Sequence, residues 1–197
     1  MSDVLVLYYS LHGATESLAR EVAHGVDAVA SMASRLRTVP RVSTVVEAVE
    51  DDVPESGPPY ATVNDLAECS GLVMGSPTRF GNMAAPLKFF LDGTGTEWIA
   101  GKAAGKPAGV FTSTSSIHGG QEATLLTMAI PLLHHGMLLV GLPYSEAALS
   151  TTTTGGTPYG ASHVSWNRKA DALSDDERNL ARALGQRVAE IAKKLET

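Results

Sequence analysis

Four apolar segments of strand length constrain the fold of this 197-residue chain more than any other feature. They are Val4–Tyr9, Gly71–Ser76, Ala108–Thr112 and Met137–Gly141. Each is a nearly continuous apolar run, which is typical of parallel strands that are covered on both faces. A weaker segment, Ser34–Val39, alternates arginine with apolar residues. It predicts a fifth strand at the edge of the sheet, with one face in water.

Helical patterns lie between these segments. Apolar residues recur at three- and four-residue spacing in Thr15–Ala33, Met83–Asp92 and Gln121–Leu133. A last helix is expected to begin after Ser174, because Ser174 and Glu177 have the spacing of a capping box. The alternation of strands and helices predicts a doubly wound α/β sandwich, in which helices cover both faces of a parallel sheet.

The length favours one domain over residues 1–197. Two irregular stretches interrupt the alternation of elements. Pro40–Asn64 is acidic and rich in proline, and Pro143–Ala172 is rich in threonine, glycine and serine. We interpret both as insertions, because loops of this length usually serve a site or an interface, or are disordered.

The composition excludes several classes of protein. The formal net charge of −6, with no run of basic residues, argues against a nucleic-acid partner. Cys69 is the only cysteine, which excludes an internal disulfide and a CxxC site, and we expect no metal. No apolar stretch reaches the roughly 20 residues that span a bilayer, and the N-terminus lacks a signal-peptide pattern. We therefore expect a cytoplasmic protein with no membrane contact.

The segments that follow the strands form the candidate site, because open parallel sheets bind ligands beyond the carboxyl ends of their strands. They are Ser10–Thr15, Pro77–Asn82 and Ser113–Gln121. All three are polar and contain glycine. None of them carries a carboxylate pair, a Cys/His metal set or a nucleophile elbow.

The loop Ser10–Thr15 combines the start of a helix with two hydroxyls and Gly13. Backbone N–H groups in this arrangement bind phosphate. Because the loop contains no lysine, a monophosphate fits it better than a pyrophosphate or a triphosphate. An ordinary N-capping turn explains the loop equally well.

In the second loop, Arg79 and Phe80 supply a planar cation and an aromatic ring, which suit a flat, electron-rich heterocycle. A solvated surface charge and a core ring are equally compatible with these two residues. The third loop offers glycines and hydroxyls that suit the ring and polyol of a cofactor, or it is a plain flexible loop.

The span Leu7–Val22 resembles the phosphate-binding signature of the flavodoxins, with an apolar pair, an aromatic residue, Ser, Gly, Thr and later Ala and Val. Further strings resemble those of the WrbA-type NAD(P)H:quinone oxidoreductases, once described as tryptophan-repressor-binding proteins. They are SPTRFGN at 76–82, GGQE at 119–122, HHGM at 134–137 and GGTPYGA at 155–161. The strings follow the family in order over nearly the whole chain, which is therefore identified as a member of it.

The resemblance implies a flavodoxin-like, five-stranded parallel sheet of order 2-1-3-4-5 that binds FMN. The FMN phosphate would be held by Ser10, Leu11, His12, Gly13, Ala14 and Thr15. The isoalloxazine would be contacted by Thr78, Arg79 and Phe80, and the same loop would add Pro77, Gly81 and Asn82 to the cofactor-binding residues. Its edge would be wrapped by Ser113, Thr114, Ser115, Ser116, Ile117, His118, Gly119 and Gly120.

The resemblance also implies a site that is completed across the subunits of a homotetramer. His134 would reach the flavin, and Trp98 would line the pocket for quinone and nicotinamide. His12 stands where the family usually has an aromatic residue beside the nicotinamide, and the segment 115–118 is longer and poorer in glycine than usual. No residue stands out as a general base, so the candidate catalytic residues are Arg79 and His134.

The predicted function is that of an FMN-dependent NAD(P)H dehydrogenase (quinone). Hydride from NADH or NADPH would pass to flavin N5, and a quinone would then be reduced by two electrons to the hydroquinone. The flavin carries this chemistry, and the protein supplies orientation and access. Two alternatives stay open: a flavodoxin-type electron carrier, and a regulatory or scaffolding protein that binds a partner protein. Trp98 as the wall of a substrate pocket favours the enzyme.

Overall fold

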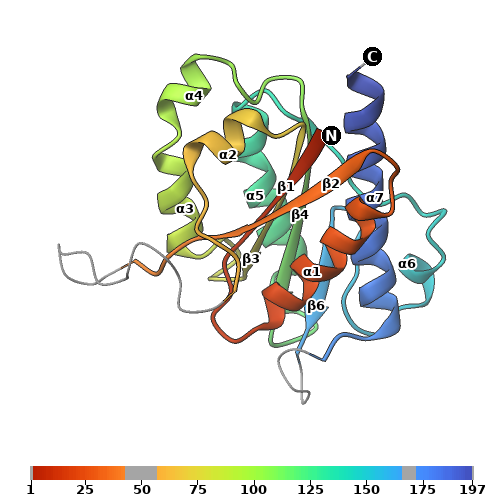
Figure 1. The fold of residues 1–197 in the computed structure, drawn as a ribbon. Helices are drawn as coiled ribbons and strands as arrows, with labels where there is room; N and C mark the ends of the chain where they lie inside the picture. Colours follow the sequence, from red (N-terminus) through yellow and green to blue (C-terminus); the bar gives the residue numbers. More distant parts are fainter. Residues whose placement is uncertain (1, 43–56, 166–171, 197) are drawn as a thin grey trace.

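The computed structural model describes residues 2–42, 57–165 and 172–196. Figure 1 shows a twisted parallel sheet between two layers of helices. Its elements are β1 (Ser2–Tyr8), α1 (Ala14–Asp27), β2 (Met32–Thr38), α2 (Val63–Glu68), β3 (Gly71–Pro77), α3 (Ala85–Asp92), α4 (Gly95–Ile99), β4 (Pro107–Thr114), α5 (Gln121–His134), β5 (Leu138–Leu139), α6 (Ala148–Thr151), β6 (Ala161–Val164) and α7 (Asp175–Leu195). The order β2-β1-β3-β4-β5 confirms the predicted order 2-1-3-4-5.

Strand β1 shows why both faces of the sheet are covered. Val4 and Val6 pack into one apolar cluster with α1 and α7, and Leu5 and Leu7 pack into a second cluster with α2, α3 and α5. All four side chains are fully buried. Because successive side chains of a strand point to opposite faces, only a continuous apolar run can fill two cores. The prediction of a doubly wound sandwich is confirmed.

Helices α1 and α7 lie side by side across one face of the sheet (Figure 1). Two glycines permit their close approach. A Cβ on Gly25 would lie 1.9 Å from the carbonyl oxygen of Arg182, and a Cβ on Gly185 would lie 2.0 Å from that of Val22. Both helices follow the carboxyl end of a parallel strand, so both begin at the same end of the sheet.

The expectation of five strands is wrong by one, because the last edge of the sheet is split. Strand β5 pairs with Pro107–Ala108 of β4, and β6 pairs with Phe111–Thr114 of the same strand. The predicted strand Met137–Gly141 thus shrinks to two residues, both exposed. Strand β6 lies in the segment Pro143–Ala172, which we interpreted as irregular.

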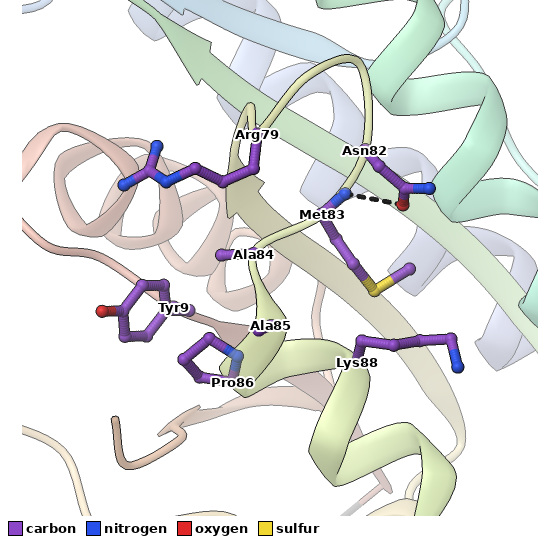
Figure 2. A pocket seen from close by; sticks show the side chains of 8 residues that line it. All are labelled: Tyr9, Arg79, Asn82, Met83, Ala84, Ala85, Pro86 and Lys88. Carbon is purple, nitrogen blue, oxygen red and sulfur yellow. Dashed lines mark hydrogen bonds between the residues drawn. The ribbon is translucent and has the colours of Figure 1, made fainter. Parts of the chain in front are cut away.

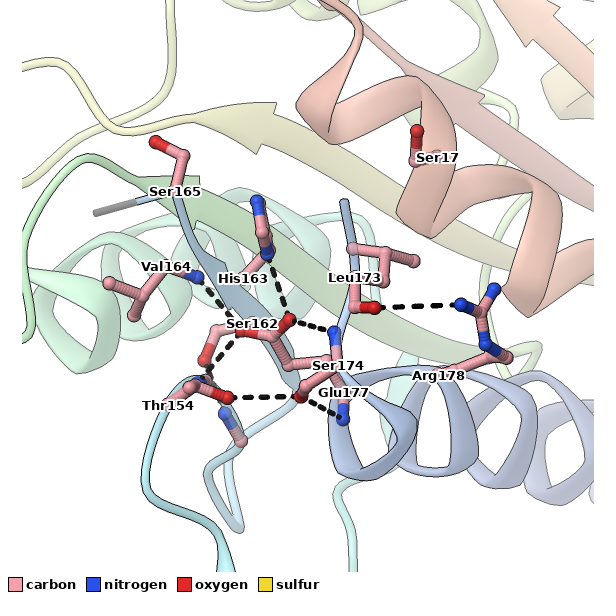
Figure 3. A network of polar contacts seen from close by, with 12 residues as sticks. Ser17, Thr154, Ser162, His163, Val164, Ser165, Leu173, Ser174, Glu177 and Arg178 are labelled. Atoms are coloured by element: carbon pink, nitrogen blue, oxygen red, sulfur yellow. Dashed lines mark hydrogen bonds and ion pairs between the residues drawn. The ribbon is translucent and has the colours of Figure 1, made fainter. Parts of the chain in front are cut away.

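Strand β6 was not predicted because it contains polar residues. Ser162 and His163 are buried because each has a specific partner, which apolar patterning does not detect. The Ser162 hydroxyl accepts the N–H of Gly156 at 2.8 Å, and His163 Nδ1 lies 2.9 Å from a carboxylate oxygen of Glu177 (Figure 3). Burial of polar groups is tolerated where hydrogen bonds satisfy them.

Three smaller differences concern element boundaries and charges. The predicted helix Thr15–Ala33 ends at Asp27, and a turn with Ser31 at φ 73° leads into β2. The short helices α2, α4 and α6 were not predicted. Strand β2 is an edge strand as expected, but its arginines are not simply in water: Arg35 pairs with Asp3, and Arg37 pairs with Asp65. Of the predicted insertion Pro40–Asn64, residues 43–56 lie outside the described part of the chain.

Two further observations bear on the sequence expectations. Burial raises the pKa of the Cys69 thiol, which fits a structural thiol better than a reactive one. Among the residues that the structure describes, none of the helices has both the length and the apolar character to cross a bilayer.

Candidate active site

Three loops meet at the carboxyl end of the sheet, as the sequence predicts. They are residues 9–13 after β1, 78–84 after β3 and 115–120 after β4. Two hydrogen bonds tie their bases together. The hydroxyls of Thr15 and Ser113 lie 2.9 Å apart, and the Thr78 N–H donates to the Ser113 carbonyl at 3.0 Å. The end of β4 therefore fixes the other two loops relative to each other.

The first loop leaves the N-terminus of α1 open. Gly13 occupies the N-cap position with φ 85°, a left-handed conformation that favours glycine. No side chain among the described residues caps this turn, which argues against the alternative of a side-chain-capped turn. The Ser10 hydroxyl is buried and has no hydrogen-bond partner within that part of the chain. Free N–H groups and an unpaired hydroxyl are what an anion at a helix start requires.

The second loop turns sharply at its tip. The Arg79 N–H donates to the Asn82 carbonyl at 2.8 Å, and the Asn82 N–H donates back at 3.1 Å. Between them Phe80 has φ 53° and Gly81 has φ 77°. Phe80 is fully exposed, which excludes the alternative of a core ring. Left-handed backbone at a bulky residue is uncommon and costs energy, so it marks a position where function is expected.

Hydrogen bonds from the first residue of α5 stabilise the third loop. The Gln121 side-chain amide donates to the carbonyls of Ser116 and Ile117 at 3.0 and 2.7 Å. The Thr114 hydroxyl donates to the Ser116 carbonyl at 2.9 Å. These contacts argue against the alternative of a plain flexible loop. Gly120 is the N-cap residue of α5, with φ 89° and no side-chain cap from the described residues, which resembles the start of α1.

A pocket of about 560 Å³ opens beside the first two loops (Figure 2). Tyr9, Met83 and Pro86 give it apolar walls, and Arg79 and Lys88 give it two cations. In Figure 2 the two cationic side chains extend in opposite directions, with Met83 between them. Sequence reasoning missed Tyr9 and Lys88. Tyr9 is the last residue of an apolar run, and the charge of Lys88 alone does not distinguish it from any other surface lysine.

Trp98 and His134 lie together, but not at the rim formed by the three loops. The Trp98 indole N–H donates to the His134 carbonyl at 2.9 Å, and the two rings are 5.3 Å apart. His134 is the last residue of α5, whereas Gln121 begins that helix at the rim. A 14-residue helix is about 20 Å long, so within one chain this pair lies at the other end of the molecule.

The neighbouring histidine belongs to the same cluster. The His135 Nε2 lies 3.1 Å from the hydroxyl of Thr94, which is buried. Burial lowers the pKa of His135, and His134 lowers it further. A neutral imidazole that bonds a buried hydroxyl suits a structural role.

The remaining predicted site residues are placed at or just below the rim, where Thr15, Ser113 and Thr114 are buried and others are accessible. Exposed side chains there are Leu11, His12, Ser115, Ile117 and His118. Thr78 turns inward instead, and its hydroxyl lies 2.8 Å from that of Thr124 on α5. Within the described ranges, no cluster of three or more metal-ligating side chains occurs.

The fold and the rim define a flavodoxin-like protein. Residues 2–151 match the family described as NADPH-dependent FMN reductase. The chain is 46% identical over 205 residues to a NAD(P)H dehydrogenase (quinone) of Chromohalobacter salexigens, and the match covers 99% of both proteins. It is 42% identical to a protein of the same name from Solidesulfovibrio magneticus, with 98% of each chain covered. The chain therefore belongs to this NAD(P)H dehydrogenase (quinone) family of FMN-reductase-type flavodoxin-like proteins.

Solved structures agree on the fold. A flavodoxin, WrbA-like protein from Agrobacterium tumefaciens superposes with a TM-score of 0.70 at 22% identity, over 98% of this chain and 99% of that one. The family and the flavodoxin-like fold implied by the sequence motifs are both confirmed.

Proposed function

We propose that this chain is an FMN-dependent NAD(P)H:quinone oxidoreductase that reduces quinones by two electrons to hydroquinones. The names of the relatives and of the family agree with the activity, the cofactor and the electron donor predicted from the sequence. The single observation that carries the proposal is the N-terminus of α1 at the rim, which the described residues leave uncapped, next to the Ser10 hydroxyl, which has no hydrogen-bond partner among them.

The residues at the rim fit FMN. The N–H groups of the first turn of α1, with Ser10, would hold the phosphate without a lysine. When bound, FMN supplies the two-electron chemistry that links NAD(P)H to the quinone. The turn Arg79–Asn82 lies next to the end of the loop 115–120, because a Cβ on Gly120 would lie 3.6 Å from the Cα of Gly81, and together they would orient the flat ring.

The side chains of the second loop have separate roles in this proposal. The Arg79 guanidinium lies at the protein surface and donates to its neighbour's carbonyl, the Thr78 oxygen, at 2.8 Å. It carries a permanent positive charge that would stabilise negative charge near the ring. Phe80 stands fully in water in one chain, so its apolar surface is available to a ring or to a second chain.

A second copy of the chain would bring Trp98 and His134 to the site. These residues lie far from their own rim, so they reach a flavin only in an assembly. The outer sides of α3, α4 and α5 support such contacts, because they carry exposed large apolar residues: Phe89, Ile99, Leu126, Ile130 and Leu133. We therefore include the homotetramer, with Trp98 of a neighbouring copy lining the substrate pocket, in the proposal. Cytoplasmic residence stays a prediction.

The test is a direct assay. The purified protein, supplied with FMN, is expected to turn yellow and to reduce benzoquinone with NADH or NADPH much faster than free FMN does. Light scattering is expected to report four copies per particle. Mixing a Gly13→Asp variant, whose phosphate site is blocked, with a Trp98→Ala variant is expected to restore activity through mixed assemblies. Rates equal to those of free FMN contradict the function, and a monomeric active protein contradicts the shared site.

A further inference from the structure

The pocket between Tyr9 and the start of α3 has two features to which the proposed function assigns no role. One is its apolar wall of Tyr9, Met83 and Pro86, and the other is the cation of Lys88. An aromatic ring with aliphatic neighbours suits a flat base such as adenine. A cation beside such a wall suits a phosphate.

The Lys88 side chain points away from the Arg79 side chain (Figure 2). Its side chain is 53% exposed, and among the described residues its ammonium pairs only with Asp92, one helical turn away. Such exposed i,i+4 pairs contribute little to folding stability. A phosphate, with more charge than a carboxylate, can therefore compete with Asp92 for this ammonium at small cost.

The start of α3 adds to the positive character of the pocket. Its N-cap is Ala84, and no side chain of the described residues caps the turn. Ala84 itself is fixed to β3, because its N–H donates to the Ser76 hydroxyl at 2.8 Å. The positive end of the α3 dipole thus faces the same pocket as the two cations.

From these observations we infer that the pocket receives the adenosine half of NAD(P)H and that Lys88 contacts one of its phosphates. The inference rests on the proposed function and deepens it, because it names a residue that recognises the electron donor. Lys88 could contact either of two phosphate groups: the pyrophosphate, which NADH and NADPH share, or the 2′-phosphate, which only NADPH carries.

The experiment uses the FMN-loaded protein and three variants. Dissociation constants for NADP⁺ and NAD⁺ are measured by calorimetry, and KM values for NADPH and NADH are measured with benzoquinone. Lys88→Gln is expected to weaken binding and raise KM by about five- to tenfold, the size of one charge-assisted hydrogen bond at an open site. Asp92→Asn, which removes the competitor of the phosphate, is expected to change both quantities in the opposite direction by about twofold.

Lys193→Gln is the matched control. It removes the same charge from an exposed lysine in the last turn of α7, at the other end of the sheet, where the ammonium donates to the Ala30 carbonyl. It is expected to change neither constant. The KM for benzoquinone is expected to stay constant in all three variants.

The outcomes separate the two sources of phosphate. A loss for NADP⁺ alone assigns Lys88 to the 2′-phosphate, and an equal loss for both nucleotides assigns it to the pyrophosphate. Unchanged constants in Lys88→Gln, or the same change in Lys193→Gln, overturn the inference while leaving the enzyme active. A wild-type protein that binds FMN but oxidises neither nucleotide overturns the proposed function as well.

Discussion

Helices α1 and α7 pack against each other and begin at the same end of the sheet, but their first turns are completed in opposite ways. At α7, the Ser174 hydroxyl accepts the N–H of Glu177 at 3.2 Å, and the Glu177 carboxylate accepts the N–H of Ser174 at 2.8 Å. At α1, Gly13 stands in the N-cap position and the described residues offer no side-chain cap.

The difference separates a helix start that serves the fold from one that serves a ligand. Glu177 is fully buried, and besides Ser174 it accepts the N–H groups of Gly155 and Val164 and contacts His163. It thereby fastens α7 to β6 and to the segment before it (Figure 3). The start of α1 has no side-chain cap from the described residues, so its first N–H groups are left for an anion or for water.

The largest expected effect on stability lies at the capped start of α7. Glu177→Ala leaves a buried histidine and three backbone N–H groups without their acceptor, and is expected to cost about 3–5 kcal/mol of folding free energy. Urea unfolding of the FMN-free protein measures it. Asp175→Ala, which removes an exposed carboxylate from the same turn, is expected to cost less than about 1 kcal/mol. Equal costs for the two variants would show that Glu177 does not fasten α7.

The second effect is a pH dependence at the same end. Burial alone would raise the pKa of Glu177, but hydrogen bonds from His163 and from the N–H groups of Ser174 and Val164 lower it to about 2, from an ordinary 4.5. The Glu177 carboxyl therefore binds its proton less tightly in the folded protein than in the unfolded chain. As a result, the ionised carboxylate stabilises the folded state fully above pH 4.5, and this stabilisation is lost as the pH falls toward 2.

The stabilisation amounts to about 3 kcal/mol. Unfolding free energies of the wild type and of Glu177→Gln are therefore expected to differ most at pH 6 and to converge by pH 2 to 3. A difference that is independent of pH would contradict the assigned ionisation.

The smallest effects compare one serine at each helix start. Ser174→Ala removes a working cap and is expected to cost about 1 kcal/mol in urea unfolding. Ser10→Ala removes a buried hydroxyl that has no partner within the described ranges, so the stability of the FMN-free protein is expected to stay the same or to rise slightly. A cost at Ser10 as large as that at Ser174 would mean that the hydroxyl already serves the fold.

The sequence predicts the centre of this molecule better than its edge. Val4 to Leu7 must fill two cores, so a buried parallel strand is the only structure that suits them. The capping box of Ser174 and Glu177 is likewise visible in the spacing. Strand β6 was not predicted, because the burial of His163 depends on Glu177, 14 positions away, and no local pattern encodes such a partner.

Some parts of the candidate site could likewise be predicted from the sequence, and others could not. The rim loops follow from the ends of apolar runs, and the structure brings them together. The position of Trp98 does not follow, because its neighbour His134 comes from the far end of another helix. The pocket at Lys88 depends on the fold of α3 against Tyr9, a contact between segments almost 80 residues apart in the chain.

The most direct test of the open helix start is a comparison of FMN with riboflavin, which lacks the phosphate. Dissociation constants are measured by quenching of flavin fluorescence for the wild type and for Ser10→Ala. The wild type is expected to bind FMN about 100-fold more tightly than riboflavin, since two or more hydrogen bonds to a charged group are involved. Ser10→Ala is expected to narrow that gap about tenfold and to leave riboflavin binding unchanged. Equal affinity of the wild type for the two flavins would contradict the assignment of the α1 start as a phosphate site.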